Sequence, residues 1–169
     1  MRHGALPGVA RAWRAAALCG LSLAAAGCAA SAGTGRAESA PERVLSFQVV
    51  DAGSRSGIDT PREAVIRSAE EWERLRQAHQ AGSPGRRPAA TVDFTTSLYV
   101  AIFAGQRPTG GFAVKVEQVV ESADGLEVVY RVVGPEPGAI VSQALTSPYE
   151  IISVTSRKSP VRFRRLPEG

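Results

Sequence analysis

Apolar and polar residues alternate in several stretches of the chain, and this alternation predicts β-strands. Between residues 44 and 51 it predicts one strand with a single buried face and a polar end. The apolar positions of this strand are Leu45, Phe47 and Val49, and its polar positions are Ser46, Gln48 and Asp51. After a loop rich in Gly, Ser, Asp and Thr, residues 64–66 (Ala-Val-Ile) predict a second, shorter strand.

The middle and the end of the chain predict the rest of a sheet. Residues 98–103 form a continuous apolar run, which is typical of a central strand covered on both faces. Residues 112–120 and 126–132 alternate on either side of Asp124-Gly125, a tight-turn signal, and predict a β-hairpin. One face of the hairpin is expected to hold Phe112, Val114, Val116, Gln118 and Val120, followed by Leu126, Val128, Tyr130 and Val132. Residues 149–155 and 161–165 predict two closing strands.

One segment carries a helical pattern. Ser68 stands three residues before Glu71, the spacing of a capping box, and Trp72, Leu75 and Ala78 or His79 follow at helical spacing. Trp72 is expected to pack between this helix and the sheet. The helix should end at a loop that contains Gly82, Ser83, Pro84, Gly85 and Pro88.

Together these elements predict an α+β domain. We expect a mainly antiparallel β-sheet of about seven strands, sandwich-like, with one α-helix packed against it. Short turns between neighbouring strands and a single early helix do not fit repeated βαβ units. The pattern does not settle the state of residues 139–146, which follow a cluster of Gly and Pro.

The first 27 residues have the organisation of a signal peptide. A positively charged flank precedes residues 15–27, which carry no charge and are too few to span a membrane as a helix. Residues 23–28, Leu-Ala-Ala-Ala-Gly-Cys, resemble the bacterial lipobox, whose cysteine is acylated and becomes the new amino terminus. We therefore expect lipidation of Cys28, with cleavage around residues 30–32 and no lipid as the alternative.

The expected organisation is a lipoprotein signal peptide over residues 1–27, a flexible tether over 28–43 and one domain over 44–167. The tether has too few apolar side chains to offset the entropy of ordering it. Two or three acyl chains would anchor the protein stably to a membrane. The resemblance implies an exported protein of the cell envelope, attached to the outer membrane if the envelope is Gram-negative.

Charge argues against a nucleic-acid partner. The chain has 20 basic and 16 acidic residues, but Arg2, Arg11 and Arg14 belong to the signal peptide, which leaves 17 basic residues against 16 acidic ones. A nearly neutral domain lacks the phosphate-neutralising surface that nucleic-acid binding requires. The basic residues near the carboxyl terminus are expected at exposed positions of an edge strand, and they are Arg157, Lys158, Arg162, Arg164 and Arg165.

The exported chain offers few residues for catalysis. Cys19 would leave with the signal peptide and Cys28 would be acylated, so we expect no disulfide and no cysteine nucleophile in the domain. His79 would be its one histidine, and the charged neighbours predict a surface position. No Gly-x-Ser-x-Gly elbow is present, and a zinc site would have to rely on carboxylates. We expect no enzymatic activity, metal or cofactor, although a Ser-His-Asp arrangement built on His79 stays open.

Residues 105–112, Gly-Gln-Arg-Pro-Thr-Gly-Gly-Phe, are the most distinctive segment of the domain. The two adjacent glycines allow positive φ and the close approach of another chain, while Pro108 stiffens the segment. Two interpretations are open. The segment is either a demanding turn between neighbouring strands or a shaped loop that presents Arg107, Thr109 and backbone amides to a partner.

This segment, together with residues 142–149 and 159–163, resembles the C-terminal domain of the PrcB protease-complex subunit family. Residues 56–58 and 65–72 are similar to it as well, so the resemblance covers most of the range 44–163. It implies a small, often lipidated envelope protein, and the family's founding role implies assembly or stabilisation of a surface protease complex. The candidate partner contacts are Arg107, Pro108, Thr109, Gly110, Gly111, Phe112, Gln143 and Tyr149.

The leading hypothesis is a non-enzymatic, membrane-tethered protein-binding module that serves as an accessory or stabilising subunit of an envelope protease complex. One alternative is a protease inhibitor. It follows from the similarity of residues 107–112 to the Asn-Pro-Thr-Thr-Gly-Tyr loop with which chagasin-type inhibitors, of immunoglobulin-like fold, enter cysteine-protease clefts. The other alternative is a small secreted hydrolase that depends on His79.

Overall fold

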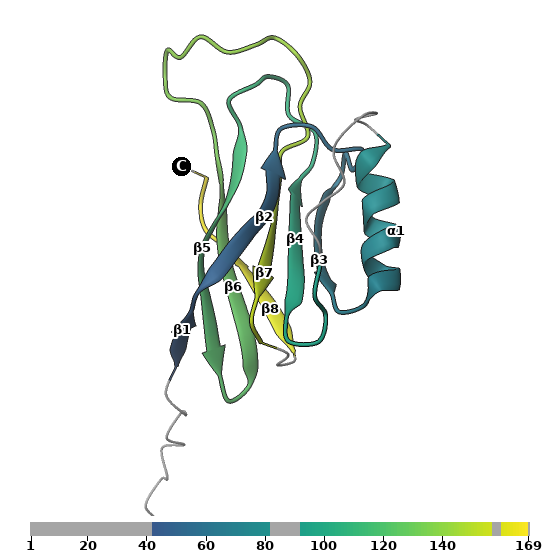
Figure 1. Ribbon diagram of the computed structural model, residues 1–169. Helices are drawn as coiled ribbons and strands as arrows, with labels where there is room; N and C mark the ends of the chain where they lie inside the picture. Colours follow the sequence, from purple (N-terminus) through teal and green to yellow (C-terminus); the bar gives the residue numbers. More distant parts are fainter. Residues whose placement is uncertain (1–41, 82–91, 157–159, 169) are drawn as a thin grey trace, which may run out of the picture. The chain divides into compact units, whose positions relative to one another are not determined.

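Two four-stranded sheets and one helix make up the fold (Figure 1). The computed structural model describes residues 42–81, 92–156 and 160–168. In order across the first sheet, the strands are β1 (Arg43–Leu45), β5 (Ala113–Ser122), β6 (Gly125–Val133) and β8 (Val161–Arg165). In order across the second sheet, they are β2 (Phe47–Gly53), β7 (Tyr149–Val154), β4 (Leu98–Ala104) and β3 (Pro61–Ile66).

The predicted α+β fold, with mainly antiparallel sheets and one helix, is confirmed. The two sheets face each other across one apolar cluster, and α1 (Ala69–Gln80) covers the other face of the second sheet through another. Neighbouring strands pair antiparallel except β6 and β8, which pair parallel. The described part of the chain therefore has three layers, with the second sheet in the middle.

β4 lies at the centre of both clusters, as its continuous apolar run predicts. It pairs with β3 on one side and β7 on the other, and every residue in it is buried. Val100 and Ile102 pack toward the first sheet, whereas Tyr99 and Phe103 pack toward α1. Because successive side chains of a strand point to opposite faces, one short segment supports two layers.

The helix begins where the capping pattern predicts. Ser68 Oγ accepts a hydrogen bond of 3.2 Å from the Glu71 backbone N–H, and Glu71 Oε2 accepts one of 2.7 Å from the Arg67 N–H. These bonds satisfy amide groups that a helix start leaves without helical partners. Trp72 is buried, with its ring centroid 5.6 Å from that of Tyr99 in β4. The prediction that Trp72 packs between helix and sheet is confirmed.

The prediction of a single strand over residues 44–51 is wrong. The chain leaves the first sheet after Leu45 and enters the second sheet at Phe47, so β1 and β2 belong to different sheets. This division gives eight strands in the described residues where about seven were expected. Val49, expected on the buried face, is 53% exposed, because β2 is an edge strand whose regular pairing stops at that residue.

A β-bulge in β2 redirects the polar end of the strand. Val50 is the extra residue, since the register with β7 shifts between Val49 and Asp51. After the shift Asp51 lies opposite Ile151, whose side chain packs in the cluster beneath α1. A bulge re-aims the side chains that follow it. Asp51 therefore faces the helix.

The predicted hairpin is confirmed as β5 and β6, with Ser122 paired to Gly125 across the turn. A second bulge, however, shifts the register between Val116 and Gln118. One extra residue moves every later side chain to the opposite face. Val119 is therefore fully buried, whereas Gln118 and Val120, which were expected on the buried face, are only half-buried.

A buried carboxylate lies beside the second bulge. Glu150 in β7 is buried, and its Oε2 accepts a hydrogen bond from the Val116 N–H in the opposite sheet. β1 pairs only with residues 119–121 of β5, so Val116 lies on an uncovered stretch of strand edge. Burial raises the pKa of Glu150, while the Val116 hydrogen bond and Lys115 act in the opposite direction. The carboxylate occupies a backbone donor that would otherwise mark an open edge.

The basic carboxyl-terminal segment forms the other edge of the first sheet. Arg162 and Arg164 in β8 are exposed, and Phe163 between them packs against the cluster between the sheets. Arg164 Nε lies 3.0 Å from Glu127 Oε2 on the neighbouring strand. The edge-strand interpretation is confirmed for these residues, whereas Arg157 and Lys158 lie outside the described residues.

Several predictions concern residues that the structure does not describe. The signal peptide, Cys28, residues 29–41 of the tether and the loop after α1 at residues 82–88 all lie outside the described residues. These expectations stay predictions. Within the described ranges, no helix has the length and apolar character needed to cross a membrane.

Candidate functional site

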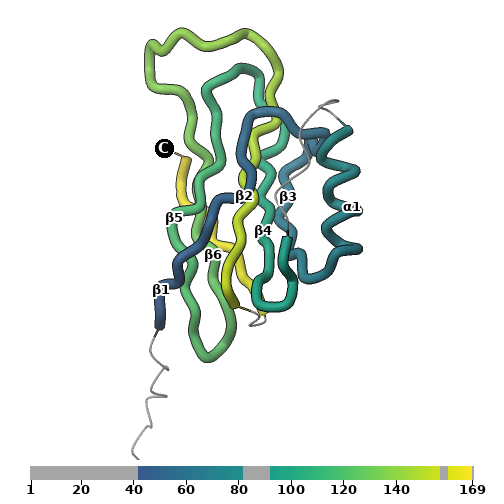
Figure 2. The backbone as a smooth tube through the Cα atoms, in the orientation of Figure 1, coloured from purple at the N-terminus to yellow at the C-terminus, as the bar shows by residue number. Residues whose placement is uncertain are grey.

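Three loops meet at one end of the sandwich, opposite the end at which Arg43 begins β1 (Figures 1 and 2). We name them loop A (residues 54–60), between β2 and β3; loop B (105–112), between β4 and β5; and loop C (134–148), between β6 and β7. Their combined surface is the loop end. It contains every predicted partner contact except Tyr149, which is the first residue of β7.

Loops B and C are joined by hydrogen bonds. Arg107 and Thr146 form an antiparallel bridge: the Arg107 N–H donates to the Thr146 carbonyl at 2.7 Å, and the Thr146 N–H donates to the Arg107 carbonyl at 3.0 Å. The Thr146 hydroxyl donates to the Thr109 carbonyl at 2.7 Å. Nearer the tip, the Gly110 N–H donates to the Ser142 carbonyl at 2.9 Å. The two loops therefore behave as one unit.

Loop A is fastened to the other two loops. The Ser147 N–H donates to the Ser54 carbonyl at 2.8 Å, and the Ser147 hydroxyl donates to Asp59 Oδ1 at 2.7 Å. The Asp59 carbonyl accepts a bond of 2.8 Å from the Gln106 N–H of loop B. With its loops cross-linked in this way, the loop end is ordered before any partner arrives, which lowers the entropy lost on binding.

The glycine pair of loop B packs against loop C. A Cβ atom on Gly110 would lie 2.5 Å from Ser142 Oγ. Gly111 has φ of +86°, and a Cβ atom there would lie 2.8 Å from Pro135 Cβ and 3.0 Å from Val141 Cγ1. Only glycine allows both the backbone conformation and the close approach. The close approach that the two glycines allow is therefore made by loop C of the same molecule.

The side chains of loop B are partly engaged within the domain. Arg107 forms an ion pair of 3.1 Å with Glu168, and its guanidinium carbon lies 5.4 Å from the ring centroid of Phe112. Thr109 and Phe112 are half-buried, whereas Pro108 is exposed. The structure thus brings the predicted residues 107–112 together, but it leaves Pro108 as the side chain most accessible to a partner.

The two other candidate contacts lie in different environments. Gln143 is exposed on loop C and is accessible to a partner. Tyr149 is 1% exposed, and its hydroxyl donates to Asp51 Oδ1 at 3.2 Å. A partner cannot touch the Tyr149 side chain while this core is folded, so its place in the structure is that of a core residue.

The prediction that His79 lies at the surface is wrong. Its side chain is buried at the end of α1, with the ring centroid 4.3 Å from that of Tyr149. Nδ1 lies 2.9 Å from Ser56 Oγ in a hydrogen bond, and Nε2 lies 3.7 Å from Asp51 Oδ2. The structure brings together four residues that are separated along the chain. We name Asp51, Ser56, His79 and Tyr149 the polar cluster.

The helical period explains the burial of His79. It follows Leu75 by four residues and Trp72 by seven, so all three lie on the helix face that meets the second sheet. Sequence reasoning missed Asp51 and Ser56 as neighbours of His79, because nothing in the local pattern reveals the bulge that turns Asp51 toward α1.

The polar cluster contains the residue types of a catalytic triad without its geometry. In a triad the histidine bridges the nucleophile and the carboxylate by hydrogen bonds. The 3.7 Å between His79 Nε2 and Asp51 Oδ2 exceeds hydrogen-bond distance. Ser56 is buried, and its Oγ accepts a further bond of 3.0 Å from the Ile58 N–H. These contacts fasten loop A and the end of α1 to the second sheet.

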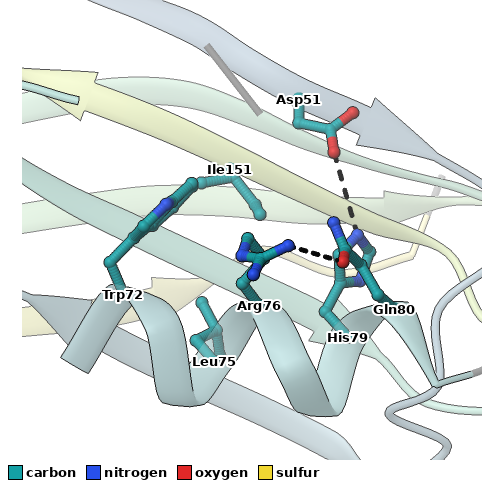
Figure 3. A pocket seen from close by; sticks show the side chains of 7 residues that line it. All are labelled: Asp51, Trp72, Leu75, Arg76, His79, Gln80 and Ile151. Atoms are coloured by element: carbon teal, nitrogen blue, oxygen red, sulfur yellow. Dashed lines mark hydrogen bonds and ion pairs between the residues drawn. The ribbon is translucent and has the colours of Figure 1, made fainter. Parts of the chain in front are cut away.

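The cleft beside the polar cluster has no room for a ligand. Figure 3 shows its lining, with Asp51 from β2, Ile151 from β7 and the other side chains from α1. Its cavity measures about 10 Å³, roughly the space of one water molecule. On the helix side, Arg76 Nη1 donates to Gln80 Oε1 at 2.9 Å. Across the described part of the chain, no three His, Cys, Asp or Glu side chains gather as a metal site requires.

The loop end holds a larger groove and two exposed apolar side chains. The groove measures about 480 Å³ and lies between loops A and C, where Leu145 is part of its lining. Leu145 is 65% exposed, and Ile140 on the same loop is 103% exposed. Sequence analysis left residues 139–146 unassigned and so missed both residues. The available signal was three branched aliphatic residues, Ile140, Val141 and Leu145, in a loop otherwise built of Gly, Pro, Ala and polar residues.

Comparison with known proteins finds a family similar to part of the chain. Residues 98–155 match the family described as PrcB C-terminal. The matched segment begins with β4 and ends one residue after β7, so it contains loops B and C and the hairpin between them. No curated protein and no solved structure matches the chain. Over residues 98–155, the chain is similar to the PrcB C-terminal family.

Proposed function

We propose that this protein is a non-enzymatic, protein-binding module of the cell envelope that acts as an accessory or stabilising subunit of a protease complex. The loop end is its contact surface. The observation that carries the proposal is the exposure of Ile140 and Leu145 on a loop fastened to its neighbours, beside a groove of about 480 Å³. The similarity of residues 98–155 to the PrcB C-terminal family supports the subunit role.

One observation supports a role without catalysis, and another weighs against the inhibitor alternative. Ser56 is buried, with its hydroxyl engaged by His79 and the Ile58 N–H, so we assign the polar cluster a structural role. The inhibitor alternative receives less support, because Gly110 and Gly111 are packed against loop C and cannot extend into a protease cleft while that packing holds. Both points favour binding through the outer surface of the loop end.

Membrane attachment through acylated Cys28 is part of the proposal. Residues 29–42 would separate the lipid from β1, and an extended chain of that length reaches roughly 50 Å. The loop end lies at the far end of the domain from Arg43 (Figure 1). A tether at one end therefore leaves the opposite end free to reach a protein partner.

Site-specific photo-crosslinking in the native strain tests the proposal. The full chain would carry a photo-crosslinking residue in place of Gln143 on loop C or, as the matched control, in place of Arg74, which is exposed on α1. We expect one discrete adduct from position 143 that contains a protease or a protein bound to it, and none from position 74. Absence of an adduct from position 143 would overturn the proposal.

Deletion of the gene provides an independent test. The abundance or activity of the crosslinked protease should fall in the deletion strain, and the wild-type gene should restore it. Cys28→Ser should restore it poorly, because the module would no longer be held at the membrane. Normal protease maturation in the deletion strain contradicts a stabilising role. Retention of fatty-acid label after Cys28→Ser contradicts the proposed anchor.

A further inference from the structure

Exposed apolar side chains distinguish loop C from the rest of the surface. Among the described residues, four large hydrophobic side chains are exposed: Val44, Val49, Ile140 and Leu145. Val44 and Val49 lie on separate edge strands, whereas the other two lie five residues apart on one loop. At 103%, Ile140 is as accessible as in an extended peptide, so no described neighbour shields it. Burial of such a side chain is favourable, and no described part of this chain supplies it.

The fold holds the segment between Pro135 and Thr146 in one shape. The Ala139 N–H donates to the Glu136 carbonyl at 2.9 Å, which closes a turn with Gly138 at φ of +80°. Ser142 follows Ile140 by two residues, and its carbonyl accepts the hydrogen bond from the Gly110 N–H. Ile140 is therefore presented from a loop that is held on both sides.

The residue next to Ile140 packs inward. Val141 is half-buried and lies against Gly111 of loop B, so near that a Cβ atom on the glycine would sit 3.0 Å from Val141 Cγ1. With Val141 seated on the glycine pair, Ile140 projects outward. The two glycines are thus positioning residues: they let loop C sit against loop B, and this contact directs Ile140 away from the domain.

The occupant of this surface is better matched by a protein than by a lipid bilayer. Loop C contains no Lys or Arg, and its one charged residue is Glu136, whereas segments that bind anionic membranes are rich in basic residues. The loop end also lies at the opposite end of the sandwich from β1, the strand that follows the proposed tether in the chain (Figure 1). Both observations direct Ile140 and Leu145 toward a protein surface.

Resting on the proposed function, we infer that Ile140 and Leu145 are the anchor residues of the interface and that the partner presents an apolar pocket, sized for branched aliphatic side chains, that receives them. Two side chains are too few to form a whole interface. They fit the pattern in which a small buried centre carries most of the binding energy and a polar rim surrounds it. Gln143 and the groove beside Leu145 belong to that rim.

The test uses the full-length chain with the crosslinking residue at position 143, in its native strain, and compares three variants. Ile140→Ser should lower the yield of the adduct by about tenfold or more, because it removes a central anchor. Leu145→Ser should lower the yield less, since this side chain is partly covered already. Val49→Ser, which changes an exposed valine on β2, should leave the yield unchanged. Thermal melts should show all three variants folded.

The outcomes separate this inference from the proposed function. No adduct from the wild-type chain at position 143 overturns both. A strong adduct that neither Ile140→Ser nor Leu145→Ser weakens overturns the anchor assignment alone. Sedimentation of the full-length Cys28→Ser chain with vesicles of phosphatidylethanolamine and phosphatidylglycerol, abolished by Ile140→Ser, would assign Ile140 to a membrane and also overturn it. Loss of the adduct in Ile140→Ser and not in Val49→Ser supports it.

Discussion

The polar cluster beneath α1 and the loop end both depart from the usual distribution of side chains: the first buries polar groups, and the second exposes apolar ones. In the polar cluster, His79, Ser56 and Tyr149 are buried, whereas on loop C two aliphatic side chains are exposed. Buried polar groups are stabilising when other groups of the fold satisfy them. Exposed apolar groups gain nothing from the fold itself. This contrast supports the proposed division of roles, with stability assigned to the polar cluster and binding to the loop end.

The two regions are also physically connected. Loop A contributes Ser56 to the polar cluster and Asp59 to the bonds with loops B and C. The Gly57 N–H donates to the His79 carbonyl at 2.8 Å, which ties the same loop to the end of α1. The polar cluster therefore fixes the position of loop A, and loop A in turn fixes one side of the loop end.

The largest expected effect concerns the packing that surrounds the polar cluster. Trp72→Ala removes a buried indole between α1 and β4, so unfolding should become easier by about 3–5 kcal/mol. Urea denaturation followed by circular dichroism measures this change, with Arg74→Ala on the exposed helix face as the control. A loss below about 1 kcal/mol would mean that α1 contributes little to the core. The stabilising role assigned to the region beneath α1 would then be wrong.

A smaller effect is expected from the polar cluster itself. Ser56→Ala removes the hydroxyl that bonds to His79 Nδ1 and to the Ile58 N–H, and both are buried. The free energy of unfolding should fall by about 1–3 kcal/mol, the usual effect of removing the partner of a buried polar group. Ser142→Ala on loop C is the matched control, because that side chain is exposed. Equal stabilities of the two variants would contradict the structural role of the polar cluster.

Local patterns in the sequence predicted the elements that local physics determines. The continuous apolar run of β4, the capping residues Ser68 and Glu71 and the turn at Asp124-Gly125 each depend on residues close together in the chain, and each prediction is confirmed. The two bulges depend instead on how strands pair at the edges of the sheets. No local pattern marks Val50 or the shift after Val116, so the faces beyond them were predicted wrongly.

The candidate site was harder to predict for the same reason. Ser56 and His79 are 23 residues apart, and Tyr149 and Asp51 are 98 apart, so only the folded chain brings them together. The helical period alone could have placed His79 inside, since it follows Leu75 by four residues. Loop C has no period, and its exposed Ile140 becomes noticeable only when the burial of its neighbours is known.

A third prediction extends the comparison to a buried carboxylate. The raised pKa of Glu150 means that the folded protein keeps a proton above pH 4.5 that the unfolded chain has lost. The contribution of Glu150 to the free energy of unfolding therefore falls as the pH rises from its ordinary pKa through its raised pKa. Glu150→Gln should remove that part of the pH dependence, because the amide does not titrate and its oxygen can still accept from the Val116 N–H. Denaturation curves between pH 4 and 8 measure the slope, and an unchanged slope would contradict the assignment.

The smallest expected change in stability falls on the residue with the largest proposed role in binding. Ile140→Ala should alter the free energy of unfolding by no more than about 0.5 kcal/mol, because the side chain has no packing to lose. Ile152→Ala is the matched control: the same side chain, fully buried between the sheets, should cost about 2–5 kcal/mol. Thermal and urea denaturation compare the two variants. If Ile140→Ala destabilised the protein as much as Ile152→Ala, Ile140 would be a packing residue and the contrast between the two regions would disappear. If its stability is unchanged while the crosslinked adduct is lost, the exposure of Ile140 is explained by binding alone.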